Sequence, residues 1–265
     1  MIPNSSAKAN ETRAKRIAND LVKYYAVSSP DDIRLEDIAM DRNVFVKEGD
    51  LKNSDAYLLR ANNRGIVRVR NSIPEIGRKR FAIAHELGHW EMHKTQSQLN
   101  FCTEDNLSDY QHSPMEIEAN IFAAELLMPH HISKQLLGKS PPSIEIAKDL
   151  AEKFGTSLTA SVIRLTELTK EDCIVVFSNN GIVKWWRKGK YFSNVPGIEK
   201  NHPLHIESEA NEILCGRKQA SKMVRVASEA WFPCARNKRN FEVYEQSIKL
   251  GNYPTIISLL WIIAD

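Results

Sequence analysis

The chain has few cysteines, and no two of them lie close together. There are four, with no Cys-x-x-Cys pair among them: Cys102, Cys173, Cys215 and Cys234. This spacing argues against a disulfide framework and favours reduced thiols in a cytoplasm.

Long apolar runs are also absent. No run approaches the roughly 18 residues that a membrane span needs, and residues 1–16 are polar, without the apolar core of a signal peptide. Hydrophobic residues make up 42% of the 265 residues and charged residues 26%, which is typical of a soluble globular protein. We therefore expect a cytoplasmic protein without a membrane partner, long enough for one large or two modest domains.

Apolar patterning predicts an α+β protein in three segments: residues 1–135, 136–170 and 171–265. In the first segment we expect helices and a small mixed sheet, with helices at 7–25 and 35–41, a strand at 44–46 and a β-hairpin formed by 56–60 and 65–70. Arg68 and Arg70 are expected on the solvated face of that hairpin, with steering of an acidic substrate as an alternative role.

The second segment, residues 136–170, contains two helical patterns around residues 154–157. Their spacing resembles a helix-turn-helix, which could read DNA. The second helix offers only Arg164 and Lys170 as cations, which is few for a helix that should neutralise several phosphates. We therefore favour a helical hairpin that packs beneath the rest of the protein.

The third segment, residues 171–265, is predicted to be a separate α/β domain. Apolar runs at 174–177 and 182–186 flank Asn180-Gly181, a pair typical of a tight hairpin turn, and a further apolar run covers 256–263. Within it, Trp185, Trp186, Arg187, Lys188 and Lys190 interleave aromatic rings with cations, a composition suited to single-stranded nucleic acid. The competing interpretation is a strand with one tryptophan in the core and solvated cations.

Residues 85–89, with the sequence HELGH, are the most informative part of the chain. On a helix, His85 and His89 lie on one face about one turn apart and can share one cation. Glu86 lies beside them, where it can take a proton from a metal-bound water. This is the arrangement of zinc metalloproteases. Gly88 costs about 1 kcal/mol against alanine in a helix, which favours close approach of another backbone.

A third ligand is expected from a second helix, which covers residues 116–128 and ends at Pro129. Glu116 shares a face with Asn120, whereas Glu118 points roughly the opposite way. We therefore predict Glu116 as the ligand, and Asn120 as the acceptor that holds a ligand imidazole by its free N–H. Glu118 and Glu125 are expected on a solvated face.

Together these segments resemble the ImmA/IrrE family of zinc metallopeptidases. The resemblance rests on residues 80–89, on Glu116-x-x-x-Asn120 and on residues 122–129, and it covers roughly residues 10–170. It implies a zincin-like domain with one zinc ion held by two histidines and a glutamate, and the motif glutamate as general base. It also implies cleavage of a helix-turn-helix repressor that derepresses genes, for example after DNA damage, and a C-terminal GAF-like sensor domain.

The loop between the two ligand-bearing helices raises a regulatory hypothesis. Cys102 could occupy the water position as an inhibitory fourth ligand, because thiolate is a strong zinc ligand; an indifferent cysteine is the alternative. Tyr110 and His112 could hydrogen-bond an oxyanion. Three other histidines are expected at the surface or behind a ligand: His93, His130 and His131.

Other functions remain open from the sequence alone. They are a DNA-binding regulator with a structural or vestigial zinc site, a module that sequesters a repressor without cutting it, and a zincin that acts on small peptides. The presence of Glu86 argues against the first two, since a structural metal site needs no base. For the C-terminal segment we expect an inducing ligand, with single-stranded nucleic acid as the leading candidate and a small molecule as the next.

Overall fold

The computed structural model describes residues 9–52, 54–94, 100–102, 113–190, 197–233 and 241–264. The chain divides into two compact units, Met1–Ser133 with Ala151–Ser157 and Lys134–Leu150 with Leu158–Asp265. The described residues form eight α-helices and two sheets, an α+β fold. Residues 136–170, which the sequence suggested as one segment, are shared between the two units. In the described part of the chain, no helix is long and apolar enough to cross a membrane.

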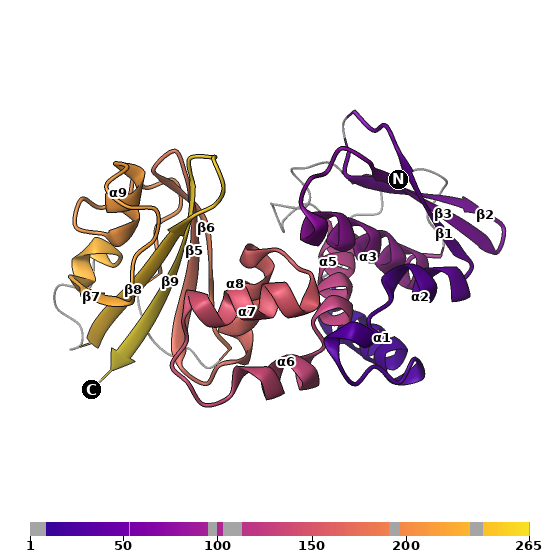
Figure 1. The fold of residues 1–265 in the computed structure, drawn as a ribbon, viewed down its shortest axis with the longest axis horizontal. Helices are drawn as coiled ribbons and strands as arrows, with labels where there is room; N and C mark the ends of the chain where they lie inside the picture. The colour runs from indigo at the N-terminus through magenta and orange to yellow at the C-terminus, as the bar shows by residue number, and fades with distance from the viewer. Residues whose placement is uncertain are drawn as a thin grey trace, which may run out of the picture. The chain divides into compact units, whose positions relative to one another are not determined.

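The first unit contains a four-stranded sheet and several helices (Figure 1). Its helices are α1 (Glu11–Tyr24), η1 (Pro30–Asp32), α2 (Leu35–Asp41), α3 (Ile76–Met92) and α5 (Pro114–Leu127). Its strands are β1 (Val44–Gly49), β2 (Ala56–Ala61), β3 (Arg64–Arg70) and β4 (Asn100–Cys102). The order is β1-β3-β2-β4, and the sheet is mixed because β1 runs parallel to β3 while β2 runs antiparallel to β3 and β4. The predicted helices, the hairpin and the mixed sheet are confirmed.

Helix α3 lies at the centre of this unit. It packs against β2 and β3 and also against α5 and α1, and every residue from 82 to 89 is buried. Because neighbours cover this stretch on all sides, its burial does not follow a single apolar stripe. The segment that carries the HELGH motif is therefore a core helix, held in place by both the sheet and the second helix.

Gly88 lies where α3 and α5 are in close contact. A Cβ atom at this position would lie 2.9 Å from Cδ1 of Phe122 and 3.3 Å from the Cα and the carbonyl oxygen of Ala119. The close backbone approach that the glycine suggested is therefore present. It holds the two helices that carry His85, His89 and Glu116 at a fixed separation.

Replacing Gly88 with alanine is expected to destabilise the protein by about 1–3 kcal/mol, as overpacking does in other cores. The sign is informative, because the same change in an uncrowded helix interior stabilises by about 1 kcal/mol. Denaturant unfolding of the two proteins measures the difference. A more stable variant would contradict the tight contact between α3 and α5.

A buried carboxylate ties the hairpin to the start of α3. The side chain of Asp55 is fully buried and accepts hydrogen bonds from Arg70 at 2.5 Å and from Arg78 at 2.6 Å. The expectation of a solvated Arg70 was therefore wrong, because strand alternation does not reveal a charged partner elsewhere in the chain. Arg68 is exposed, as predicted.

The second unit is built on a five-stranded antiparallel sheet with the order β6-β5-β9-β8-β7. Its strands are β5 (Asp172–Asn179), β6 (Ile182–Lys188), β7 (Val224–Val226), β8 (Phe241–Lys249) and β9 (Thr255–Ala264). Its helices are α8 (Leu158–Leu168), α9 (Glu209–Leu214) and η2 (Ser228–Ala230), while α6 (His130–Leu137) and α7 (Ile144–Phe154) each have residues in both units. The predicted hairpin turns at Asn180 and Gly181, whose φ angles are 50° and 73°.

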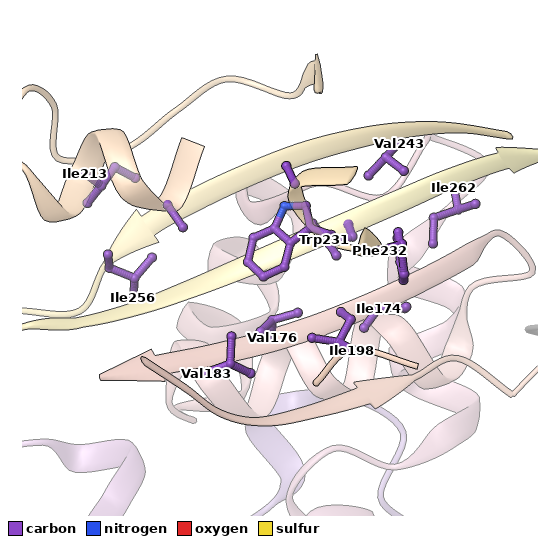
Figure 2. Packing of buried hydrophobic residues seen from close by; sticks show 13 residues of the cluster. Ile174, Val176, Val183, Ile198, Ile213, Trp231, Phe232, Val243, Ile256 and Ile262 are labelled. Carbon is purple, nitrogen blue, oxygen red and sulfur yellow. The ribbon is translucent and has the colours of Figure 1, made fainter. Parts of the chain in front are cut away.

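Both faces of this sheet are covered by apolar side chains. On one face, Ile174 and Val176 of β5 pack in a cluster with Trp231 and Phe232, as Figure 2 shows. On the other face, Val175 packs with residues of α7 and α8. Because it is buried on both faces, β5 is a continuous apolar run rather than an alternating one. The second unit thus has a substantial core of its own.

Candidate metal centre

Three side chains from α3 and α5 meet at one point in the first unit. The Nε2 atoms of His85 and His89 are 3.0 Å apart. Each also lies close to the carboxylate of Glu116, at 3.1 Å from Oε2 for His85 and 3.3 Å from Oε1 for His89. The imidazoles are buried, whereas the Glu116 side chain is 19% exposed. The three residues selected from the sequence are brought together, with Glu116 on the more open side.

The separations within this cluster fit a single zinc ion. Two ligand atoms held at about 2.0–2.1 Å from one ion at the tetrahedral angle are about 3.3 Å apart. The two Nε2 atoms are 3.0 Å apart, and His85 and His89 lie 3.1 and 3.3 Å from different oxygens of the Glu116 carboxylate. With one ligand atom taken from each residue, all three lie within 4.8 Å of one another. Two imidazole nitrogens and a carboxylate are also a donor set found in catalytic zinc sites. The donor atoms and their spacing therefore both suit this metal.

The start of α5 positions the carboxylate of Glu116. Ser113 caps the helix by accepting a hydrogen bond from the backbone N–H of Glu116 at 3.3 Å, and Pro114 occupies the first turn. A serine followed three residues later by glutamate is the pattern of a capping box, in which the glutamate side chain turns back to the cap. Here the Glu116 carboxylate contacts the two histidines.

Asn120 holds the far side of His85. Its Oδ1 atom lies 2.8 Å from Nδ1 of His85, one turn after Glu116 on α5. An amide oxygen can only accept, so the ring proton of neutral His85 lies on Nδ1 and leaves the lone pair of Nε2 directed at the cluster. The geometry matches the role suggested for Asn120 from the sequence.

His89 is held by a longer chain of contacts. Its Nδ1 atom lies 2.9 Å from Nδ1 of His93, whose Nε2 lies 3.0 Å from Oε2 of Glu118. Both His93 and Glu118 are buried, at 6% and 7% exposure. The expectation of a solvated Glu118 was therefore wrong. Helical phase indicated that Glu118 faces away from Glu116, but not that α1 and His93 cover that face.

Burial and the Glu116 carboxylate set the protonation of the cluster. Burial raises the pKa of Glu116, but hydrogen bonds from His85 and His89 lower it more, so its carboxyl ionises well below its usual range. Burial lowers the pKa of His85, yet Glu116 and Glu86 outweigh it and the net pKa is raised. Burial dominates at His89 and lowers its pKa to about 4. The cluster therefore favours one positive charge close to the carboxylate.

Glu86 and Arg60 complete the surroundings of the histidines. Glu86 follows His85 directly on α3 and is fully buried. Arg60 of β2 donates a hydrogen bond to the carbonyl oxygen of His89 at 2.5 Å and lies over the ring of Trp90, 4.7 Å from its centroid. The sequence did not indicate this contact of Arg60. A strand residue that donates to a carbonyl oxygen of a distant helix is not marked by any short sequence pattern.

Several other residues considered from the sequence lie elsewhere or outside the description. The backbone of Cys102 pairs with Ala56 as part of β4, but its side chain, like Tyr110 and His112, lies outside the described residues. His130 and His131 are exposed, as expected.

Glu125 does not lie on a solvated face, contrary to expectation. It is 3% exposed and accepts a hydrogen bond from the backbone N–H of His130 at 3.0 Å. Helix α5 is covered on more sides than a surface helix, so its charged residues are buried with partners. Glu125 is therefore, after Glu118, a second buried glutamate on α5, and it is a different residue from the proposed ligand Glu116.

The aromatic residues of β6 are both used in packing. The ring of Trp185 stacks on Phe177, with centroids 5.1 Å apart and planes 2° apart. Trp186 packs against the cluster on the opposite face and donates from Nε1 to the carbonyl oxygen of Ile198 at 2.6 Å. Arg187 is half-buried, and Lys188 and Lys190 are exposed. These contacts agree better with a packed strand than with rings that stack on bases.

Helices α7 and α8 have few features of a DNA reader. Arg164, one of two cations noted for the second helix, is 4% exposed and contacts Glu167 at 3.2 Å. A buried arginine cannot contact a phosphate backbone without a rearrangement. Ile144, Ala147, Val162 and Leu165 instead bury the two helices against β5 and β9.

Comparisons with known proteins agree with this geometry. Residues 39–166 match the family model of the IrrE N-terminal-like domain, peptidase family M78, and this range includes all three residues of the cluster. The fold is similar to that of a transcriptional regulator from Mycobacterium tuberculosis, with a TM-score of 0.57 over 94% of this chain and 75% of that chain. The two sequences are 14% identical, so this likeness concerns the fold alone. No curated protein is significantly similar. Residues 39–166, just under half of the chain, therefore form an IrrE N-terminal-like domain of the ImmA/IrrE family, which is of the metallopeptidase type.

Proposed function

We propose that this protein is a zinc-dependent endopeptidase that cleaves a helix-turn-helix transcriptional repressor. The observation that carries the proposal is the meeting of His85, His89 and Glu116 at metal-ligand spacing, beside a buried Glu86. A structural zinc site needs four protein ligands and no base, whereas a catalytic site has three ligands and an open position. The described residues offer three, with the third partly exposed.

In this proposal His85, His89 and Glu116 hold the ion, and Glu86 is the general base. Zinc bound at this point would polarise the scissile carbonyl and lower the pKa of a water molecule. Glu86 accepts the proton of the attacking water and then delivers it to the leaving amine. Asn120 keeps the Nε2 lone pair of His85 directed inward. Full burial of Glu86 excludes bulk water from the carboxylate, which strengthens its interaction with a nearby positive charge.

The second unit is proposed to regulate the first. Apolar clusters on both faces of its sheet support a domain with its own hydrophobic core. We propose that this domain is a GAF-like sensor of an inducing ligand. The contacts of Trp185 and Trp186 favour a small molecule over single-stranded nucleic acid as that ligand. We place the reaction in the cytoplasm, where a repressor would be encountered.

A DNA-binding regulator without proteolysis is the main alternative. The burial of Arg164 argues against it, and so does the presence of a buried acid beside a three-ligand cluster. The structural neighbour is named a transcriptional regulator, but a protease that removes a repressor also regulates transcription. The alternative is favoured only if a sequence-specific footprint forms without metal.

The proposal is tested by incubating the zinc-loaded protein with a helix-turn-helix regulator encoded beside its gene, with and without single-stranded DNA or a cell extract. Mass mapping of fragments is the measurement. One defined cleavage that a chelator abolishes supports the proposal. A stable complex without fragments under every condition would indicate a sequestering module instead.

A further inference from the structure

We propose that His93 and Glu118 are positioning residues for His89, and that they connect the metal centre to the N-terminal helix α1. The inference rests on the proposed zinc site and goes beyond its three ligands. The contacts run in one unbroken series from His89 to His93, from His93 to Glu118, and from Glu118 to the backbone of Asn10. None of these residues belongs to the HELGH motif except His89.

The direction of the protons along this series follows from its two ends. Glu118 as a carboxylate can only accept, so Nε2 of His93 carries a proton and donates it. Nδ1 of His93 is then an acceptor, and the proton between the two histidines lies on Nδ1 of His89. A neutral His89 protonated at Nδ1 has its lone pair on Nε2, the atom that faces Glu116. The series therefore selects the tautomer that binds a metal.

Glu118 is itself fixed from α1. Its Oε1 accepts from the backbone N–H of Asn10 at 2.8 Å, and Oε2 lies 3.7 Å from Nη1 of Arg13. Arg13 also donates from Nη2 to the carbonyl oxygen of Met92 at 2.8 Å, near the end of α3. These contacts hold the carboxylate and the end of α3 together, so the position of α1 controls the far end of the series.

The two histidines are thus supported in different ways. His85 donates to a neutral amide, Asn120, while His89 is linked through an imidazole to a negative charge. A carboxylate behind a ligand histidine fixes the ring and raises its basicity.

The test compares zinc affinity in three variants of the full chain. His93→Phe removes the ring nitrogen that accepts from His89 and the ring N–H that donates to Glu118. Glu118→Gln keeps the size of the side chain but leaves one carbonyl oxygen for two donors, His93 and the backbone N–H of Asn10. Both are expected to weaken zinc binding about 10–100-fold, the usual effect of losing an outer partner of a ligand. Glu125→Gln is the matched control, because Glu125 is a buried glutamate on the same helix that accepts a hydrogen bond from the backbone N–H of His130. Its zinc affinity should be unchanged.

Competition with a chelating indicator gives the affinity, and thermal unfolding of the metal-free proteins gives the stability. Comparable loss of stability in Glu118→Gln and Glu125→Gln, with loss of affinity only in the former, supports the positioning role. Equal affinity in all folded variants overturns it, as does equal weakening in Glu125→Gln. If the unchanged protein binds no zinc, the proposed function itself fails, which is a different outcome.

Nitrogen-15 shifts of the imidazoles in the zinc-loaded protein provide a second, direct readout. The series requires a proton on Nδ1 of His89 and on Nε2 of His93. A proton found on Nδ1 of His93 would overturn the proposal even if the variants lose affinity.

Discussion

Replacing Glu86 with glutamine is expected to abolish peptide cleavage while zinc remains bound. Glutamine has nearly the same size and shape, so it fits the same buried position, but it cannot accept a proton from water at neutral pH. A positioned general base contributes about 10²–10⁴-fold to a rate, and loss of both proton transfers should place the variant at or beyond the upper end of that range. The measurements are the rate of fragment formation from a proven substrate and the zinc content of the same sample.

The control for this experiment is Glu91→Gln. Glu91 lies on the same helix and is also largely buried, but its carboxylate pairs with Arg42 at 2.8 Å rather than with the cluster. Its loss should reduce stability and leave the cleavage rate of the folded protein within a few-fold of normal. Full activity in Glu86→Gln would show that another group is the base.

Removing any one of the three proposed ligands is expected to abolish the stabilisation of the fold by zinc. The variants are His85→Ala, His89→Ala and Glu116→Gln. A ligand that binds only the folded state stabilises it by about 2.7 kcal/mol at a hundredfold excess over its dissociation constant. For a chain of this size, that corresponds to a rise in melting temperature of about 5–10 °C. The rise should occur in the unchanged protein and be absent in the three variants.

His131→Ala is the matched control for the ligand variants. His131 is an exposed histidine in the same unit, so its loss should leave the zinc-induced rise in melting temperature intact. A rise of normal size in His85→Ala or Glu116→Gln would place the metal elsewhere. Loss of the zinc-induced rise in melting temperature in His131→Ala would also show that the metal binds elsewhere.

The parts of the fold that were predictable from sequence depend on local physics. The turn at Asn180 and Gly181 requires two positive φ angles, which these residue types tolerate. Helical phase separates Glu116 from Glu118 on α5 because their side chains lie on different faces. The cost of a glycine in a helix indicated the close contact at Gly88, and the contact is present.

The errors concern charged residues that are buried with partners, and two of these residues, Glu118 and Arg70, have partners in other elements of the fold. Glu118 was expected in solvent, but its backbone partner Asn10 is 108 residues away. Arg70 was expected in solvent, but it pairs with the buried Asp55. Periodicity reports which face a residue occupies and not which segment covers that face. His93 was expected at the surface or behind a ligand, but its contact with Glu118 could not be found from sequence for this reason.

The tryptophans of β6 illustrate a related limit. Adjacent aromatic residues on a strand point to opposite faces, so one of them is normally expected in solvent, where it could bind a ligand. Trp185 and Trp186 are both packed because this sheet has an apolar cluster on each face. The sequence shows that aromatic and cationic residues occur together on this strand. Whether the rings are buried or free to bind a ligand depends on the side chains that cover each face of the sheet.

X-ray absorption spectroscopy of the zinc-loaded protein tests the central claim most directly. The account predicts one zinc ion per chain with two imidazole nitrogens at about 2.0–2.1 Å and a carboxylate oxygen at about 2.0–2.2 Å, and loss of one imidazole from the spectrum in His85→Ala. A spectrum without imidazole ligands, or one that His85→Ala leaves unchanged, would contradict it.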